Sequence, residues 1–516
     1  MKIRFLGIFL FPTILFAQQK DTLAMRYATL IKAETMREYL HVLASDEYEG
    51  RETAKKGQKM AAAYISEQFK KFGIPPYKEN TYLQPFSIEQ YRNTPIVTQV
   101  TTVTSKGNTF SSEKDYCLIP GRGQYELNFP TILFAGYGID DKNYSNYKGI
   151  SAENKVLMVL DGEPVLNDST SLITGDKSRS EWTTFYKRKI ERAYKSGATA
   201  LLIVSENFEK DLEANKTKLP FIRTEKGRVE LPVFYISKSM ANALLRKTTV
   251  EALKKKLMSS KKGFTKKIKT PLLISIKTIP EKLSSENVLA YIEGGDLRNE
   301  LIVISAHYDH LGKDGAMIYN GADDDGSGTS AVLNLAKVFA MAKKEGHGPR
   351  RSILIIAFSG EEKGLLGSDY YVNHPEFPLK NTVCDLNIDM IGREDDKYKG
   401  NPNYIYVIGS DKLSSELHEI NEYENKTYCN LQLDYTYNDE HEKNRYYYRS
   451  DHYNFAKNGI PVIFYFNGVH ADYHKETDEV DKIDFNKMEK ITRLVFYTAW
   501  EIANRDKRIA VDSNKK

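Results

Sequence analysis

From Asn287 onward the chain alternates between short apolar runs and helical segments, and this alternation restricts the fold more than any other feature. The apolar runs of strand length lie at 288–292, 301–306, 352–358, 385–389, 404–408 and 461–466. Segments with helical spacing of apolar residues lie at about 330–342, 365–373, 413–422 and 485–503. Strands that alternate with helices predict an α/β fold, with a mixed, mostly parallel central sheet flanked by helices.

The rest of the chain predicts a second domain inserted into the first. A length of 516 residues exceeds one ordinary core. From about 21 to 72 the pattern is helical, and Pro75-Pro76 stop it. Short β-rich runs follow, such as 155–160 and 200–204. We therefore divide the main domain into 18–105 and 281–505, with a β-rich insertion at 106–280 and a polar tail at 506–516.

The first 17 residues have the pattern of a signal peptide. Lys2 and Arg4 precede an almost wholly apolar stretch at 5–16, and Ala17 follows it. About a dozen apolar residues fall short of the ~20 that span a bilayer, which argues against a membrane anchor. With no cysteine just after Ala17, a lipid anchor is not expected either. We predict export of the chain, to the periplasm or the medium.

Charge and cysteine content exclude several classes of protein. Removal of Lys2 and Arg4 lowers the formal charge from +5 to +3, which is too weak a bias to indicate nucleic-acid binding. The lysine-rich stretch at 254–269 needs no ligand on a solvated face. Three scattered cysteines allow at most one disulfide and form no metal knuckle. The oligomeric state is left open.

Acids and histidines gather at or just beyond the predicted strands of the main domain. They are His307, Asp309, Asp323, Asp324, Asp325, Glu361, Glu362, Asp389 and His474. An open α/β sheet collects its ligands at the carboxyl ends of its strands. Each motif alone has an ordinary structural explanation, such as a hydrogen-bonded pair or an acidic helix start. Because five separate segments offer suitable ligands, we predict a site for two metal ions.

The three adjacent acids and the Glu361-Glu362 pair carry most of this argument. Three neighbouring carboxylates repel one another unless cations compensate, and the run lacks the alternating acids of a calcium loop. In the glutamate pair, one carboxylate can bind metal while the other acts as general base. Burial of the Asp389 carboxylate on an apolar strand costs free energy unless the carboxylate is paired or coordinated. Nitrogen and oxygen donors suit Zn²⁺, with Co²⁺ or Mn²⁺ as less favoured ions.

At these residues the chain resembles the co-catalytic di-zinc aminopeptidase family, metallopeptidase family 28 of clan MH. The resemblance covers about 285–502, and the helical segment at about 30–85 is also similar. It implies a zinc-exopeptidase (phosphorylase/hydrolase-like) fold, with 106–280 as an inserted protease-associated (PA) domain. It also implies the metal ligands: His307 and Asp389 on one zinc, Glu362 and His474 on the other, and Asp324 as the bridge.

The same resemblance implies the catalytic roles. Glu361 would be the general base for a metal-bridging water that hydrolyses the peptide bond, and Asp309 would orient His307. Asp325 would help form an unusual peptide link beside the bridge. Tyr473 or one of Tyr446, Tyr447 and Tyr448 would assist at the oxyanion. Asp451 would bind the substrate amino group, with His452 a less favoured ligand.

Several activities remain open within this resemblance. Removal of N-terminal residues from peptides is the default, but a dipeptidyl peptidase or a carboxypeptidase shares every ligand. A glutaminyl cyclase has the same fold and one working zinc, and a non-catalytic receptor-like module loses ligands or the base. Because all five ligand positions and Glu361 are present, we expect a hydrolase. The sequence does not determine the side-chain preference.

Overall fold

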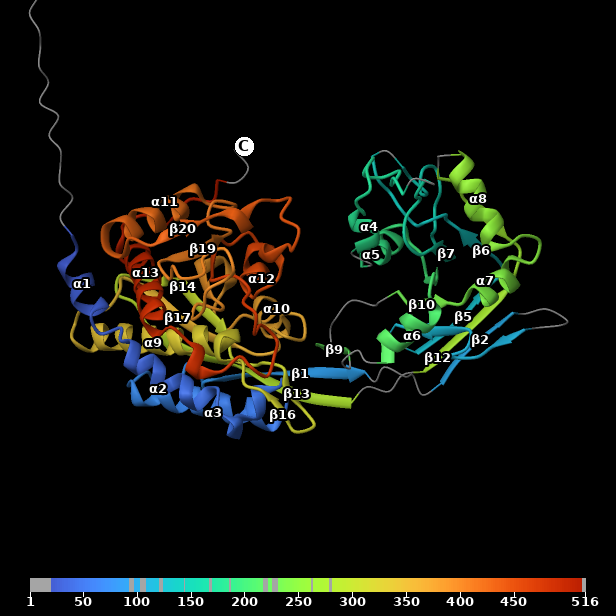
Figure 1. The fold of residues 1–516 in the computed structure, drawn as a ribbon. Coiled ribbons are helices and arrows are strands. Elements are labelled where there is room, and N and C mark those ends of the chain that lie inside the picture. Colours follow the sequence, from blue (N-terminus) through green and yellow to red (C-terminus); the bar gives the residue numbers. More distant parts are fainter. Residues whose placement is uncertain are drawn as a thin grey trace, which may run out of the picture. The chain divides into compact units, whose positions relative to one another are not determined.

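The computed structural model divides into two compact units (Figure 1). Unit 1 comprises Met1–Phe86 and Ser284–Lys516, and unit 2 comprises Ser87–Leu283. The structure describes residues 20–512 except 92–96, 103–107, 120–123, 143, 167–168, 185–186, 217–220, 225–230, 261–262 and 278–280. The predicted signal peptide, 1–17, therefore lies outside the described residues.

The inserted unit starts earlier than the expected position 106. Strand β2 (Val97–Thr102) pairs antiparallel with β12 (Leu272–Lys277), which joins residues before 106 to the end of unit 2. This pairing connects segments about 170 residues apart, so local sequence patterns do not reveal it. The observed bounds of the unit are Ser87 and Leu283.

Unit 1 is built on a mixed sheet whose centre is parallel. Four neighbouring parallel strands form this centre, in the order β21 (Val462–Phe466), β18 (Thr382–Ile388), β14 (Leu297–His307) and β17 (Arg351–Phe358). On one side follow β19 (Tyr404–Ile408), antiparallel to β21, and β20 (Gln432–Asp434). On the other follow β13 (Glu281–Ile292), antiparallel to β17, and β1 (Leu83–Tyr91). The predicted mostly parallel α/β fold is confirmed.

Helices cover both faces of this sheet. One face packs against α2 (Ala33–Leu43), α3 (Lys56–Lys71), α9 (Gly328–Lys344) and α13 (Phe485–Asn504), with α1 (Thr22–Ala28) and α11 (Ser415–Glu424) beside them. The other packs against α10 (Leu366–Asn373) and α12 (His452–Ala456). Alternate residues of one strand serve the two faces, as Ile304 and Val303 do in β14.

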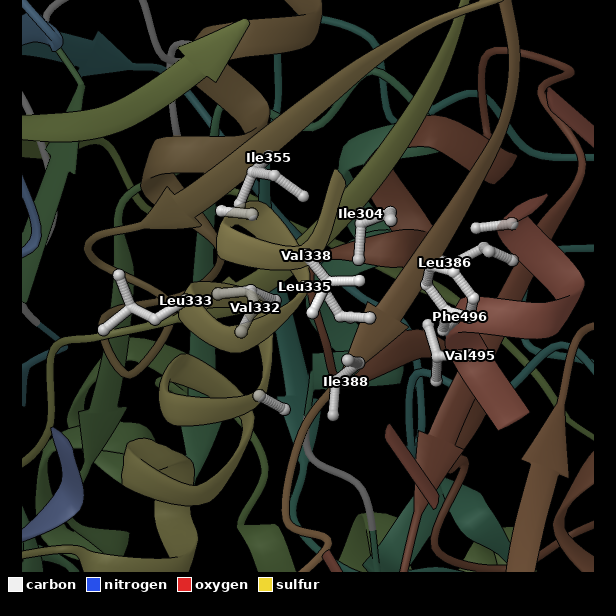
Figure 2. Close-up of a cluster of buried hydrophobic side chains, with 14 of the residues drawn as sticks. Ile304, Val332, Leu333, Leu335, Val338, Ile355, Leu386, Ile388, Val495 and Phe496 are labelled. Atoms are coloured by element: carbon white, nitrogen blue, oxygen red, sulfur yellow. The ribbon is translucent and has the colours of Figure 1, made fainter. Parts of the chain in front are cut away.

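The core beneath α9 holds this helix firmly on the sheet. Figure 2 shows Leu335 and Val338 of α9 among Ile304, Leu386 and Ile388 of the strands. Val495 and Phe496 of α13 close the same cluster, and all of these side chains are fully buried. Since the three adjacent acids lie in η2 (Ala322–Ser327), directly before α9, this packing fixes their position relative to the strand ends.

Unit 2 contains two sheets of its own. The six-stranded sheet has the order β11 (Lys266–Ile268), β6 (Ile132–Phe134), β7 (Val156–Leu160), β8 (Ala200–Val204), β10 (Val233–Ile236) and β4 (Tyr116–Leu118). The four-stranded sheet has the order β3 (Thr109–Phe110), β2, β12 and β5 (Gln124–Phe129). The helices of the unit are α4 (Glu181–Thr184), α5 (Lys187–Lys195), α6 (Phe208–Lys216), α7 (Lys238–Leu245) and α8 (Val250–Ser260).

Two further observations bear on the sequence predictions. Cys117, Cys384 and Cys429 are all buried and free, so the one possible disulfide does not form. Among the residues that the structure describes, no helix has the length and apolar character needed to cross a membrane.

Candidate metal centre

The carboxyl ends of the four central strands bring the predicted ligands together. His307 is the last residue of β14, and Asp389 directly follows β18. Glu361 and Glu362 lie three and four residues beyond β17, and His474 lies in the loop after β21. Because these strands are adjacent and parallel, their carboxyl ends meet at one edge of the sheet.

His307, Asp324 and Asp389 form a first group of donors. His307 Nε2 lies 3.3 Å from Asp324 Oδ1 and 3.7 Å from Asp389 Oδ1. Ligand atoms 2.0–2.2 Å from a tetrahedral zinc ion lie about 3.3 Å apart, so this spacing fits one ion. The three residues are buried, and their donor atoms lie close enough together to hold a metal.

A second group forms on the other side of Asp324. His474 Nε2 lies 3.0 Å from Asp324 Oδ2 and 3.4 Å from Glu362 Oε2. These separations again match the edges of a tetrahedral zinc site. Asp324 thus directs one carboxylate oxygen to each group, which is the arrangement expected of a bridging ligand.

Sequence reasoning missed His310, which joins the second group. Its Nδ1 lies 2.8 Å from Glu362 Oε1 and 3.9 Å from Asp324 Oδ2. Its imidazole is fully buried. The available signal was its position directly after Asp309, in the segment that follows β14, but its partner Glu362 comes from a different strand end.

The charges of the cluster are consistent with a cation site. Burial raises the pKa of Asp324, but the contacts with His307 and His474 outweigh it and hold that pKa well below its usual range. Burial and the charge of Asp324 raise the pKa of Glu362, while His310 and His474 lower it to about 2. Burial lowers the pKa of His474, and the two carboxylates raise it to about 10. Carboxylates that hold protons on nearby imidazoles so strongly can hold a divalent cation instead.

An unpartnered buried oxygen provides the test of fit. Asp324 Oδ2 is buried and has no hydrogen-bond partner in the described part of the chain. Buried polar atoms are rarely left unsatisfied unless an ion, water or function accounts for them. The donor types, their spacing and this oxygen therefore fit zinc.

Glu361 stands beside the first group without being one of its close donors. Its Oε2 lies 3.9 Å from His307 Nε2, and its side chain lines the cavity above the donors. Burial raises the pKa of Glu361 well above its ordinary value; His307 opposes this rise, and the carboxylates of Glu362, Asp389 and Asp451 add to it. A carboxylate of raised pKa is suited to accept a proton near neutral pH.

Asp309 contacts His307 differently from the sequence expectation. His307 Nδ1 lies 3.1 Å from the main-chain oxygen of Asp309 and 3.8 Å from its carboxylate. The carboxylate instead accepts hydrogen bonds from the Thr53 hydroxyl at 2.5 Å and the Glu361 N–H at 3.2 Å. Asp309 therefore positions His307 through its main-chain carbonyl group and Glu361 through its carboxylate.

The cavity beside the donors is lined by polar and apolar side chains. Its polar lining is His307, Asp324, Glu361, Asp389, Tyr446, Arg449, Tyr473 and His474, and its apolar lining is Met390, Phe464, Phe466 and Val469. Arg449 Nη2 donates a hydrogen bond to Tyr473 Oη at 3.2 Å. Of the four tyrosines considered from sequence, Tyr473 and Tyr446 line this cavity.

Comparison with known families identifies the domain that holds the cluster. Residues 287–499 match the model of peptidase family M28, and this range contains every donor described above. The chain carries a peptidase family M28 domain.

Relatives of this M28 domain include proteins named as peptidases. Aminopeptidase YwaD of Bacillus subtilis (strain 168) is 26% identical over 341 residues, which cover 64% of this chain and 62% of that protein. A probable zinc metalloprotease of Pyrenophora teres f. teres (strain 0-1) is also 26% identical over 341 residues, covering 58% of this chain and 68% of its own length. The chain thus spans under two thirds of the first of these relatives.

A solved structure supports the fold. The aminopeptidase from Aneurinibacillus sp. strain AM-1 has a TM-score of 0.54 and 20% sequence identity, covering 95% of this chain and 98% of that chain. At this level of identity the likeness concerns the fold alone.

The acids that flank Asp324 in the M28 domain accept hydrogen bonds from nearby main-chain N–H groups. The Asp324–Asp325 peptide bond is cis, at the position where the family resemblance implied an unusual link. Asp325 accepts hydrogen bonds from the N–H groups of His307, Gly328 and Met390, and so joins three segments of the site. Asp323 accepts one from Gly392 N–H at 2.6 Å.

Asp451 is not placed as the sequence suggested. Its side chain is fully buried, accepts a hydrogen bond from the Ser368 hydroxyl and does not line the cavity. The residue immediately precedes α12, which packs on the sheet and turns the carboxylate inward. Asp451 is therefore not positioned to bind a substrate amino group. His452 is likewise buried, with its ring stacked on Phe464.

Arg51 is a further residue that sequence reasoning missed. Its fully buried guanidinium donates four hydrogen bonds to main-chain oxygens, those of Leu43, Tyr308, Asn320 and Gly321. These bonds connect the N-terminal segment of unit 1 to the residues on either side of the metal donors. A buried cation at this position also offsets the negative charge of the surrounding acids.

Proposed function

We propose that the chain is a zinc-dependent exopeptidase, most simply an aminopeptidase that removes N-terminal residues from peptides. The observation that carries this proposal is the position of Asp324, with one oxygen toward His307 and the other toward His474. Two metals held by a shared carboxylate, with a free carboxylate beside them, suit hydrolysis. The relatives named as peptidases support the same reaction class.

The donor set assigns the metals. His307 and Asp389 would hold one zinc ion, Glu362 and His474 the other, and Asp324 would contact both. Co²⁺ or Mn²⁺ could replace zinc at such nitrogen and oxygen donors. When bound, zinc supplies Lewis-acid polarisation of the scissile carbonyl and lowers the pKa of water.

The protein's own groups supply the proton transfers. Glu361, with its raised pKa, takes the proton from the attacking water and returns it to the leaving amine. Asp309 fixes the Glu361 backbone during this exchange. Tyr473 donates a hydrogen bond from its hydroxyl group to the developing oxyanion, because Arg449 already donates to the Tyr473 oxygen and leaves the O–H free.

The apolar residues that line the cavity indicate the kind of side chain accepted. Met390, Phe464, Phe466 and Val469 offer apolar surface beside the donors. Burial of an apolar side chain there contributes roughly 1.5–3 kcal/mol to binding. We therefore propose peptides with a large apolar N-terminal residue as substrates. Export, based on residues 1–17, and a PA-type role for the inserted unit stay predictions.

A panel of fluorogenic substrates tests this function. Free-amino leucyl and phenylalanyl substrates should be cleaved, their amino-blocked counterparts should not, and a chelator should abolish cleavage until zinc is restored. Preferential cleavage of dipeptidyl substrates would make the enzyme a dipeptidyl peptidase, and release of C-terminal residues would make it a carboxypeptidase. Cyclisation of N-terminal glutamine without peptide hydrolysis would identify a glutaminyl cyclase. A chain that binds zinc and acts on none of these would contradict the proposal.

His474→Ala is expected to lower the bound zinc from two ions per chain to one. The reason is that His474 contacts only the second donor group, through Glu362 Oε2 and Asp324 Oδ2. Elemental analysis of the purified protein after dialysis measures the change. Replacement of the exposed His441 by alanine serves as the control and should leave two ions bound. Unchanged stoichiometry in His474→Ala would remove His474 from the ligand set.

A further inference from the structure

His310 has a fully buried imidazole and no role in the proposed reaction. Its Nδ1 lies 2.8 Å from Glu362 Oε1. Neither atom has a hydrogen-bond partner among the described residues, and both are shielded from solvent. An unpaired donor and an unpaired acceptor at such a distance require an explanation, because leaving either unsatisfied costs about 1–3 kcal/mol.

Two roles are possible for such an imidazole, and the distances separate them. Ligands of one tetrahedral zinc ion lie about 3.3 Å apart. The His474 contacts with the same group, 3.0 and 3.4 Å, agree with this spacing. His310 Nδ1 is closer than that to Glu362 Oε1, at 2.8 Å, and farther from Asp324 Oδ2, at 3.9 Å. A separation of 2.8 Å lies in the distance range of a charge-assisted hydrogen bond.

The two oxygens of Glu362 have different neighbours. Oε1 faces His310, whereas Oε2 faces His474 and the second donor group. A hydrogen bond to Oε1 would prevent rotation of the carboxylate and keep Oε2 directed toward the metal position. Such outer partners of ligating carboxylates commonly set metal affinity.

Two contacts fix the position of His310. Its main-chain N–H donates a hydrogen bond to the main-chain oxygen of Arg51 at 3.2 Å. Gly321, at φ +54°, lies against the ring, and a Cβ atom at that position would come within 2.4 Å of His310 Cδ2. Any larger residue at 321 would displace the imidazole, so the contact with Glu362 depends on this glycine.

We propose that His310 is a positioning residue, which donates its Nδ1–H to Glu362 Oε1 and so raises the affinity of the second metal position. This inference rests on the proposed function, since it assumes a metal at the second donor group. It adds a residue to the site that acts on a ligand without binding the metal itself.

The test compares zinc binding by full-length variants, measured by competition with a chromogenic chelator. His310→Ala removes the donor and should weaken one of two zinc sites by about 10- to 100-fold, leaving the other unchanged. His310→Asn is the matched variant, because its amide nitrogen occupies nearly the place of Nδ1; it should bind both ions almost as the wild type does. In His310→Gln the amide lies farther from the main chain than Nδ1 does, so this variant should behave like His310→Ala. Near-UV circular dichroism of the metal-free proteins verifies folding.

Two results would overturn the positioning role. Wild-type affinity at both sites in His310→Ala and His310→Gln would show that the contact with Glu362 has no effect on metal binding. If His310→Asn loses one zinc site as completely as His310→Gln does, the imidazole itself binds the metal. Absence of zinc from the wild-type protein would instead contradict the proposed function, so the two failures are distinguishable. If His310→Ala does not fold, the comparison of asparagine with glutamine still decides.

Discussion

Glu361→Gln is expected to lower the turnover of an aminoacyl substrate by about 100- to 10,000-fold, the range that general acid–base catalysis contributes. The amide has nearly the shape of the carboxylate but cannot accept the proton from water. The Glu361 N–H bond to Asp309 belongs to the main chain and is unaffected by the substitution. Steady-state kinetics should show the loss in kcat, with KM changed little.

Metal content distinguishes the base from a ligand in this experiment. Glu361→Gln should retain two zinc ions, because Glu361 Oε2 lies 3.9 Å from His307 Nε2, farther than any ligand contact described for the first group. Glu440→Gln, an exposed glutamate, is the matched control and should have wild-type activity. Full activity in Glu361→Gln would remove Glu361 as the base. Loss of a zinc ion would make it a ligand.

The fold and most of the donors follow from local sequence patterns. Apolar runs of strand length predicted β14, β17, β18 and β21, and residues directly beyond such runs must lie at the carboxyl edge of a parallel sheet. His307 and Asp389 are therefore found from strand ends alone. In these cases the information is contained within about ten residues, where hydrophobic periodicity is a strong signal.

The remaining features depend on contacts between distant segments. The role of His310 follows from its contact with Glu362. The role of Arg51 follows from its hydrogen bonds to carbonyl groups of residues more than 250 positions away. The family resemblance implied that Asp451 binds the substrate amino group, but packing of α12 buries its side chain. The start of unit 2 depends on the pairing of β2 with β12. Tertiary packing determines each of these, and no local pattern encodes it.

The structure also explains why so many acids can share one site. Arg51 is a fully buried cation, and His307, His310 and His474 lie 2.8–3.9 Å from the carboxylates of Asp324, Glu361 and Glu362. Asp325 accepts hydrogen bonds from backbone N–H groups, and Asp323 accepts one from Gly392 N–H and lies 3.2 Å from His470 Nε2. Asp324 faces both donor groups, with Oδ1 toward His307 and Oδ2 toward His474. Its removal therefore should affect more than one metal.

Asp324→Ala is expected to weaken both zinc sites by more than about 100-fold, since loss of an outer partner alone costs 10- to 100-fold. The carboxylate places Oδ1 3.3 Å from His307 Nε2 and Oδ2 3.0 Å from His474 Nε2, so each group loses one donor. Elemental analysis after dialysis should find almost no zinc, in contrast to one ion in His474→Ala, and hydrolysis should be lost with the metal. Asp314→Ala, at the exposed end of strand β15 (Gly312–Asp314), is the control for loss of a carboxylate. Retention of one tightly bound ion in Asp324→Ala would mean that Asp324 belongs to a single site, and the shared-ligand arrangement on which the proposed function rests would be wrong.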